Sequence, residues 1–279
     1  MPELPEVETV CKYLNLFVLN KTIVDVKIYE KKILKNIEFN QFKEKIKNQT
    51  ITKIIRKGKY IIFLLTKSTL VSHLRMEGKY FYYLNEELLK FNKHKMIAFY
   101  FSHNDILVYS DTRKFGTMHF FLDHNFLNKN PLKKLGIEPF DKNFNAQYLE
   151  SNWKNKRRAI KTTLLEQNVI AGIGNIYADE ILFLSKIHPL SVTNKLTLYD
   201  LKKLVLATKI ILRKAIKNNG TTIKSFYSFQ EKFKGNFQFK LKVYHRNNQK
   251  CFDCNFLIKK IKLNNRSSHF CNNCQILKR

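Results

Sequence analysis

The first ten residues place groups suited to covalent chemistry at the free end of the chain. They hold two prolines and three glutamates, in the order Met-Pro-Glu-Leu-Pro-Glu-Val-Glu-Thr-Val. If Met1 is removed, as a small second residue permits, Pro2 carries a free secondary amine. Because an α-amino group titrates near ~7.7–8.0, a useful fraction is uncharged at neutral pH. Such an amine can attack a sugar aldehyde carbon to give a cationic iminium that drives elimination, with the Glu3 carboxyl as proton donor.

Two other interpretations of this segment are possible. Pro5 in a first helical turn, with Glu6 and Glu8 near the positive end of the helix dipole, describes an ordinary helix start. That description gives no role to Pro2 or Glu3. A secretory signal is rejected, because the segment is acidic and has no apolar core.

Four of the five cysteines lie near the other end, as Cys251-x2-Cys254 and Cys271-x2-Cys274 with 16 residues between the pairs. Two such pairs predict one structural zinc ion with tetrahedral geometry, whereas a redox dithiol needs only one pair. Disulfides are not expected without a secretory signal. The intervening residues suit a β-hairpin with Arg266 near its far end, and the closed four-sulfur shell argues against catalysis by this zinc.

The net charge of +29, from 51 Lys and Arg against 22 Asp and Glu, indicates a polyanionic partner. With 44% hydrophobic and 13% aromatic residues the chain is not a disordered basic tail. Nucleic acid is the first candidate partner and an anionic membrane surface the second. No apolar run approaches the ~18 residues that span a bilayer, so we expect no membrane insertion.

The hydrophobic pattern divides the chain into a strand-rich part and a helix-rich part. Residues 5–18 form an amphipathic helix with Cys11 as an inert core thiol. Alternating segments then predict about eight short strands, which suggest a sandwich or barrel: residues 23–28, 51–56, 60–65, 70–74, 80–84, 96–101, 106–109 and 116–121. Helical patterns follow: residues 145–151, 156–166, 175–184 and 197–218.

Four loop segments could carry binding side chains. Three of them interrupt the strand region, at Arg56-Lys57-Gly58-Lys59-Tyr60, at residues 73–78 and at residues 110–116. A solvated loop accounts for any one alone, but together they suggest basic and apolar fingers on one rim of a sheet. The fourth is Gly172-Ile173-Gly174 before a helix, which frees backbone amides for an anion. A tight turn between helices is the other interpretation, and the absence of a preceding strand argues against a nucleotide site.

Taken together, these motifs closely resemble the bacterial formamidopyrimidine-DNA glycosylases, which repair 8-oxoguanine. The resemblance runs the whole length of the chain. It is carried by segments in the family's order: residues 2–9, 57–60, 73–78, 111–116, 172–178 and 220–222, and the four cysteines with Arg266 between them.

The resemblance implies an α+β fold, in which an N-terminal β-sandwich flanked by helices precedes a helical helix–two-turn–helix domain and a zinc-finger hairpin. It implies four domains or segments: residues 1–131 (catalytic), 132–150 (linker), 151–235 (helix–two-turn–helix) and 236–279 (zinc finger). It also implies a bifunctional glycosylase and abasic-site lyase that acts on damaged double-stranded DNA. We expect a monomer in the bacterial cytoplasm.

The resemblance further implies roles for individual residues. Pro2 forms the Schiff base with C1′ of the damaged nucleotide, and Glu3 protonates the sugar oxygen. Lys59 assists the first elimination and Arg266 the second. The expected DNA contacts include phosphate-binding residues and a wedge that fills the gap left by the flipped base: His94, Arg113, Lys156 and Asn175, with Met76, Arg113 and Phe115 as the wedge.

Three features depart from the family pattern. His245 stands where the family is expected to carry glycine, so the turn entering the zinc finger could differ. Residues 275–279 extend past the last cysteine. Residues 221–235, which in the family form a flexible loop over the damaged base, are rich in aromatic side chains, so lesion contacts are not transferred to them.

Two alternative functions remain. Endonuclease VIII shares the Pro-Glu start but prefers oxidised pyrimidines, although residues 3–7 and the Arg113/Phe115 pair favour the purine enzyme. The chain could also be a zinc-finger DNA-binding protein without enzymatic activity, with Pro2 only starting a helix. Nicking of an abasic-site duplex without added metal separates an enzyme from such a binder.

Overall fold

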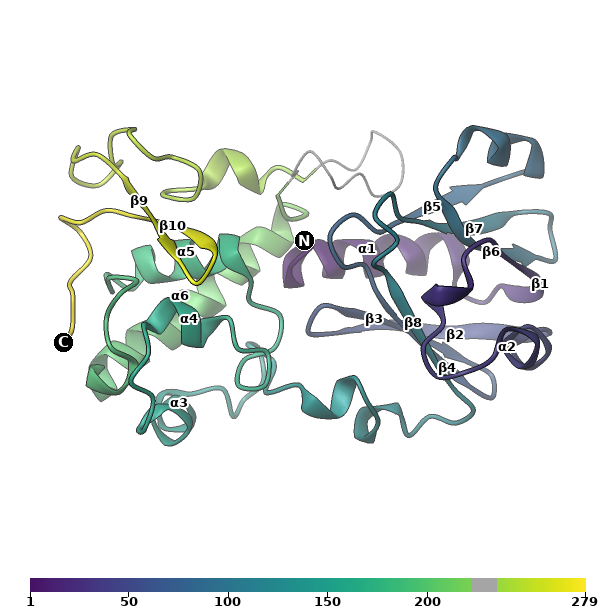
Figure 1. Cartoon of the computed structure of the whole chain (residues 1–279), viewed down its shortest axis with the longest axis horizontal. Coiled ribbons are helices and arrows are strands. Elements are labelled where there is room, and N and C mark those ends of the chain that lie inside the picture. Colours follow the sequence, from purple (N-terminus) through teal and green to yellow (C-terminus); the bar gives the residue numbers. More distant parts are fainter. Residues whose placement is uncertain (222–234) are drawn as a thin grey trace. The chain divides into compact units, whose positions relative to one another are not determined.

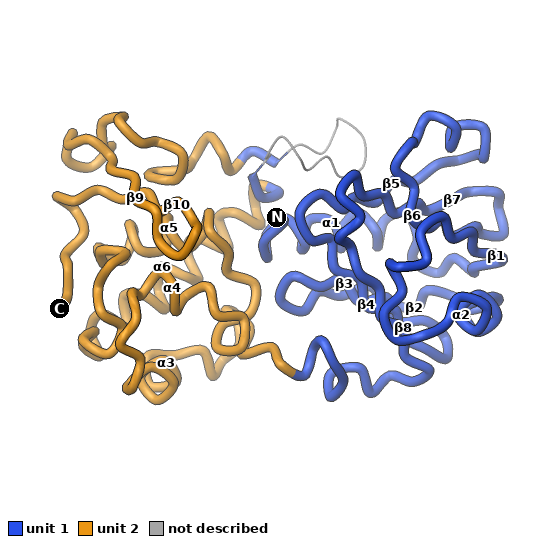
Figure 2. Tube along the Cα trace, viewed as in Figure 1, with its two compact units in different colours: residues 1–133, 219–236 blue, residues 134–218, 237–279 orange. Residues whose placement is uncertain are grey.

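The computed structural model of the chain describes residues 1–221 and 235–279. Contacts divide the chain into two compact units, which Figure 2 shows in different colours. Unit 1 comprises residues 1–133 and 219–236, and unit 2 comprises residues 134–218 and 237–279. Most of the aromatic segment 221–235 lies outside the described residues. The four-part domain division given above remains a proposal.

Eight antiparallel strands build unit 1, in the order β5-β7-β6-β1-β2-β3-β4-β8 (Figure 1). Their bounds are as follows: β1 Thr22–Ile28, β2 Gln49–Lys57, β3 Tyr60–Leu65, β4 Thr69–His73, β5 Lys79–Tyr83, β6 Lys95–Phe101, β7 Ile106–Ser110 and β8 Thr117–Phe121. Strands β1 and β2 share only two paired positions, Thr22 with Thr50 and Ile23 with Gln49. The sheet can therefore fold at this seam into two facing halves, and the predicted sandwich is confirmed.

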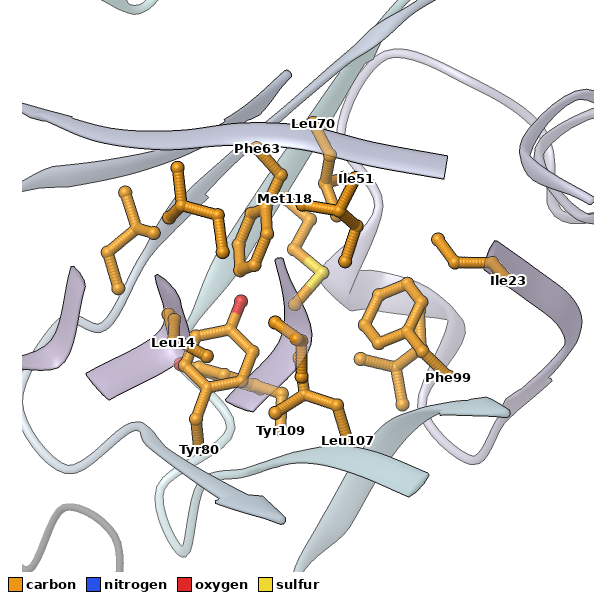
Figure 3. Close-up of a cluster of buried hydrophobic side chains, with 14 of the residues drawn as sticks. Leu14, Ile23, Ile51, Phe63, Leu70, Tyr80, Phe99, Leu107, Tyr109 and Met118 are labelled. Carbon is orange, nitrogen blue, oxygen red and sulfur yellow. The ribbon is translucent and has the colours of Figure 1, made fainter. Parts of the chain in front are cut away.

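The core of unit 1 lies between these two halves. Figure 3 shows Phe63 and Met118 from one half facing Tyr80, Leu107 and Phe99 from the other. Helix α1 (Leu4–Val18) adds its apolar face to the same cluster through side chains that include Leu14. Its Cys11 is buried, and burial raises the pKa of the thiol, as expected of an inert core cysteine.

Helix α2 (Phe39–Ile46) was not predicted. It buries only Phe42 and Ile46, and two apolar positions in eight residues give too short a pattern for the helical period to be recognised. Short 3₁₀ segments also lie in unit 1, at Lys31–Ile33, Glu86–Phe91 and Phe126–Asn128, and a further one, Leu132–Lys134, crosses the boundary to unit 2.

Unit 2 contains helices and one hairpin: α3 Ala146–Trp153, α4 Ile160–Leu164, α5 Asn175–Leu184, α6 Leu198–Lys217, β9 Lys259–Leu263 and β10 Arg266–Phe270, with 3₁₀ segments Thr193–Lys195 and Phe237–Lys240. The helix predicted over 156–166 is shortened to α4. The reason is that Ala159 forms a β-bridge with Val192, and the Ile160 N–H donates to the Ser191 carbonyl. These contacts take the place of the first helical turn.

The β9–β10 hairpin has the predicted position and places Arg266 at its far end. Its two-residue turn is Asn264-Asn265, with φ of 46° and 60°. Positive φ at both positions is the requirement of a type I′ turn, which asparagine tolerates well. Arg266 is the next residue and pairs with Leu263. The side chain that the sequence analysis singled out therefore starts β10 directly after a tight turn.

The C-terminal extension packs within unit 2. The Gln275 side chain is buried; its Oε1 accepts from the Cys271 N–H at 2.9 Å and its Nε2 donates to the Ile187 carbonyl at 2.8 Å. The Val192 N–H donates to the Lys278 carbonyl at 2.8 Å. These residues are therefore part of the fold that surrounds the cysteines. Within the described ranges, no helix is long and apolar enough to cross a membrane.

Candidate active site

The N-terminus is fixed by a reciprocal capping box at the start of α1. The backbone N–H of Glu3 donates to Glu6 Oε2 at 2.9 Å, and the Glu3 side chain accepts from the Glu6 N–H. Both glutamates are buried, with 3% and 2% of their surface exposed. A capping box satisfies two helix-end donors at once and sets the direction in which the chain enters the helix. Pro2 is therefore held at a defined place beside the Glu3 carboxyl.

The second oxygen of Glu6 binds a distant part of unit 1. Glu6 Oε1 accepts from the Thr221 N–H at 2.8 Å and from the Thr221 hydroxyl at 3.2 Å. A Cβ on the preceding Gly220, which has φ of 74°, would lie 2.5 Å from the same oxygen. Glycine is needed at that position both for its backbone conformation and for its lack of a side chain. Glu6 thus joins the N-terminus to residues 220–221.

The electrostatic surroundings of the N-terminal amine favour its uncharged form. Burial lowers the pKa of the Met1 amine below its usual value, and the nearby Lys59 ammonium acts in the same direction. Glu3, Glu6 and Glu77 oppose this shift. Lys59, which is 5% exposed, is the second residue of the two-residue turn between β2 and β3. Three sequence segments therefore bring charged groups to the N-terminus: the start of α1, the β2–β3 turn and the β4–β5 loop.

The loop that carries Arg113 and Phe115 is organised by Asp111, a residue to which the sequence analysis gave no role. Its carboxylate accepts from the backbone N–H groups of Arg113, Phe115 and Gly116 at 2.8–2.9 Å. Asp111 is 2% exposed, whereas Phe115 is 52% exposed. The Arg113 guanidinium lies 4.7 Å from the centre of the Phe115 ring. A buried carboxylate thus holds an exposed cation–aromatic pair in place.

The neighbouring loop presents Met76, and the two loops are joined. The Gly78 N–H donates to the Leu74 carbonyl at 2.9 Å, which closes the turn, and Arg75 has φ of 54°. Met76 is 40% exposed, and the Thr112 hydroxyl donates to the Glu77 carboxylate from the other loop. The structure therefore brings together the three predicted wedge residues on linked loops of unit 1.

The other predicted contact residues have the following surroundings. His94 is exposed, and its carbonyl accepts from the Asp111 N–H at 3.1 Å. In unit 2, the Lys156 ammonium pairs with Glu166. Asn175, at the start of α5, donates from Nδ2 to the Ser267 carbonyl at 3.0 Å. Arg266 is exposed. The ion pair of Lys156 and the structural hydrogen bond of Asn175 were not foreseen.

The four cysteines of the predicted metal site converge in unit 2. Their sulfur atoms all lie within 4.8 Å of one another, with 3.9 Å between Cys251 and Cys274 and 3.4 Å between Cys254 and Cys271. A tetrahedral site with Zn–S bonds of about 2.3 Å has sulfur–sulfur edges of roughly 3.8 Å. The donor set and spacing therefore fit a tetrahedral ion bound by four thiolates.

Comparison with known proteins shows which family and which solved structures this chain is similar to. Family models described as the formamidopyrimidine-DNA glycosylase N-terminal domain and H2TH domain match residues 1–118 and 135–227. The chain is 47% identical to the formamidopyrimidine-DNA glycosylase of Mycoplasma genitalium over 99% of its length and 96% of the relative's. The corresponding protein of Ureaplasma parvum is 44% identical over 99% of this chain and 100% of the relative.

Solved structures of a Lactococcus lactis protein, Fpg, are also similar. A mutant bound to DNA containing Fapy-dG has a TM-score of 0.91 and 37% identity, covering 98% of this chain and 99% of the other. The wild-type protein with DNA containing an oxidised pyrimidine has a TM-score of 0.89 and 36% identity, with the same coverage. These likenesses extend over both units.

The wedge loops should depend on the absence of a side chain at Gly116. An added Cβ would lie 1.9 Å from the Tyr109 hydroxyl oxygen and 2.5 Å from Cζ of the same buried ring. We expect Gly116→Ala to lower the free energy of unfolding by about 1–3 kcal/mol, because the packed ring cannot move freely. Urea unfolding measures this loss. Adding Tyr109→Phe removes the nearest atom and should restore part of it, and an unchanged midpoint in Gly116→Ala would refute the packing argument.

Proposed function

The chain belongs to the formamidopyrimidine-DNA glycosylase family, and on that premise we propose which of its residues excise oxidised purines from duplex DNA. As a member it is a DNA repair glycosylase. The proposal that Pro2 is its nucleophile is supported above all by one observation: the reciprocal capping box of Glu3 and Glu6, both buried, fixes the chain at Pro2 next to the Glu3 carboxyl.

The lesion class is part of the proposal. The relatives named above carry the formamidopyrimidine name, so an endonuclease VIII-like enzyme or a DNA-binding protein without activity is not favoured. The Lactococcus lactis protein has been solved with DNA containing Fapy-dG and with DNA containing an oxidised pyrimidine. We propose 8-oxoguanine and formamidopyrimidines as the main substrates, with activity on oxidised pyrimidines as the minor one.

Excision begins when the damaged nucleotide leaves the helix, because its sugar carbon cannot be reached inside the base stack. The Pro2 nitrogen donates its electron pair to C1′, and the C1′–N bond to the base breaks with its electrons leaving on the base. The proton on the Pro2 nitrogen passes to the departing base, which frees the nitrogen electron pair to open the sugar ring. Glu3 gives a proton to the sugar ring oxygen as the ring opens. The product is an iminium between Pro2 and C1′, a cation that withdraws electrons from the sugar.

Two eliminations follow from this iminium. A proton leaves C2′, its electron pair forms the C2′–C3′ double bond, and the C3′–O bond breaks with its electrons leaving on phosphate. A proton then leaves C4′, a C4′–C5′ double bond forms, and the C5′–O bond breaks in the same sense. Each leaving phosphate gains negative charge, which a nearby cation stabilises. Lys59 is proposed for the first elimination and Arg266 for the second.

Binding is proposed to use the side chains presented by the loops. Met76 and Phe115 would fill the space of the flipped base, and stacking would offset part of the cost of extrusion. Arg113 would face the orphaned partner base. His94, Lys156 and Asn175 would bind phosphates, for which Lys156 must exchange Glu166 for the DNA backbone.

The proposal also covers the metal ion, the domain boundaries and the place where the protein acts. Cys251, Cys254, Cys271 and Cys274 are proposed to hold one zinc ion, which supplies folding energy to a hairpin too small to be stable alone. We also propose domain boundaries at residues 131, 150 and 235. The protein is proposed to act as a monomer in the bacterial cytoplasm.

Borohydride reduction during reaction with an 8-oxoguanine:C duplex should trap a covalent complex whose adduct maps to Pro2. Trapping should fall as the pH drops below the usual titration range of an α-amino group near ~7.7–8.0, because a protonated amine has no electron pair with which to attack C1′. Pro2→Gly, or retention of Met1, should slow base release by roughly 10²-fold or more. A thymine glycol duplex should react more slowly. An adduct on a lysine would overturn the assignment.

Arg113 should determine which base is accepted opposite the lesion. Its fixed N–H donors suit the acceptor edge of cytosine, whereas adenine presents a donor there. Arg113→Ala should therefore slow excision opposite C about ten- to a hundredfold more than opposite A. Phe115→Ala is the matched control, since a stacking ring should affect both pairs equally. Single-turnover rates on the two duplexes decide, and an unchanged C:A ratio in Arg113→Ala would limit Arg113 to a phosphate contact.

A further inference from the structure

A buried ion pair lies directly behind the hairpin that carries Arg266. Lys161 of α4 and Asp179 of α5 are each 1% exposed, and Lys161 Nζ lies 2.7 Å from Asp179 Oδ1. A buried ion pair gains little net stability, because removal of both charges from water costs about as much as their attraction returns. The roles proposed above do not use this pair. Its hydrogen bonds indicate what it does.

Both members of the pair bind β10, at the three residues that follow Arg266. Lys161 Nζ donates to the Ser267 carbonyl at 2.7 Å. Asp179 accepts from the Ser268 hydroxyl at 3.2 Å and from the His269 backbone N–H at 2.9 Å. Charged groups form the stronger hydrogen bonds, and burial strengthens them further. The backbone of β10 is thus held from two helices immediately after Arg266.

The tip of the hairpin is also attached to α4. Asn264 Nδ2 donates to the Thr162 hydroxyl at 3.1 Å. Thr162 is the neighbour of Lys161, and Asn264 is in the turn just before Arg266. Arg266, Lys161 and Asn264 line the same pocket, whose volume is about 230 Å³. Arg266 is therefore bracketed by anchored residues, Asn264 on one side and Ser267 on the other, while its own side chain remains exposed.

We propose that the buried Lys161–Asp179 pair is a positioning device for Arg266 that serves the second elimination. The inference rests on the role proposed for Arg266. Because both side chains are buried, the pair acts through the backbone of β10. It fixes the backbone from which the guanidinium extends, so that the charge stands where the phosphate on C5′ departs. Preorganised charge is effective because it need not move as the leaving group develops its own.

The proposal predicts a step-specific defect. The first elimination uses Lys59 of unit 1, which is remote in sequence and belongs to a different unit. Loosening β10 should therefore leave base release and cleavage at C3′ nearly unchanged and slow cleavage at C5′. The nicked product that retains the unsaturated sugar should accumulate at the expense of the product that ends in phosphate.

The variants are chosen to separate positioning from folding. Removing one partner alone would leave a buried unpaired charge, so the main variant replaces both, Lys161→Met with Asp179→Leu, which keeps an apolar contact of similar volume. Asp179→Asn is the second variant, because it retains the shape but cannot accept at both oxygens. Since it also leaves the Lys161 charge without its counterion, its urea unfolding and duplex binding are measured beside its rates. Lys186→Met is the matched control, since Lys186 forms an exposed pair with Asp253 elsewhere in unit 2.

The assay uses the zinc-loaded full chain and an abasic-site duplex, with the two nicked products resolved by gel. We expect the double replacement and Asp179→Asn to slow the second elimination by about tenfold or more, with the first within about threefold of wild type. Arg266→Ala should have the same defect, and combining it with the double replacement should add nothing, as for residues that act as a unit.

Three results would overturn the inference: an unchanged product ratio in the double replacement, an equal loss in both eliminations with weakened duplex binding, or a normal second elimination in Arg266→Ala. A normal second elimination in Arg266→Ala would contradict both the role of Arg266 and the role of the Lys161–Asp179 pair. A wild-type protein that leaves the abasic duplex intact would instead contradict the proposed lyase function. Failure of the inference and failure of the proposed function are therefore distinguishable.

Discussion

The buried carboxylate of Glu6 is the interaction on which the N-terminal site depends. One oxygen accepts from the Glu3 N–H and the other from Thr221, which is 215 positions away in the sequence. A hydrogen bond to a charged group contributes about 1.5–3 kcal/mol net, and an unpaired carboxylate in this place would cost more than that. Because both oxygens are used, the first residues cannot shift without breaking bonds at each end. A chain terminus, normally the loosest part of a fold, thereby becomes rigid enough to hold a reactive amine.

The same device recurs in other parts of the chain. Asp111 binds three N–H groups of the wedge loop. Glu180 accepts from the N–H groups of residues 242–244, the segment that leads to the cysteines, and its burial raises the pKa of its carboxyl. Asp179 holds β10. With only 22 acidic residues against 51 basic ones, several of the acids are buried backbone acceptors, which leaves the exposed surface predominantly basic.

Features that depend on residues close together in the sequence were predicted correctly. Helix α5 begins and ends at the predicted residues, because Gly174 caps it before Asn175 and mainly apolar residues continue it to Leu184. The spacing of the cysteines predicted that the four sulfur atoms would lie close together. His245 keeps the backbone conformation of the glycine expected in the family, because its φ of 58° is one that a glycine adopts freely. The centre of its ring lies 4.5 Å from the centre of the Tyr244 ring, on which it stacks.

The remaining features depend on partners far away in the sequence. Nothing near Glu6 specifies Thr221, and nothing near Lys161 specifies Ser267, since these pairs form only when the fold brings the segments together. The helix predicted from residue 156 begins late for a similar reason, because Ala159 finds a strand partner in Val192. Periodicity identifies which face of an element is buried, but it does not identify the polar partner that a buried charge will meet.

The most direct test of this account is the rate of borohydride-trapped adduct formation on an abasic duplex in Glu6→Gln. The amide can accept at only one end, so either Glu3 or Thr221 loses its acceptor and the amine is displaced. The account predicts a fall of about ten- to a hundredfold. Glu8→Gln is the matched control, because Glu8 is partly exposed and its bond to Arg56 lies outside the capping box, so its rate should stay within about twofold. A wild-type rate in Glu6→Gln would contradict the claim that this carboxylate positions the reactive N-terminus.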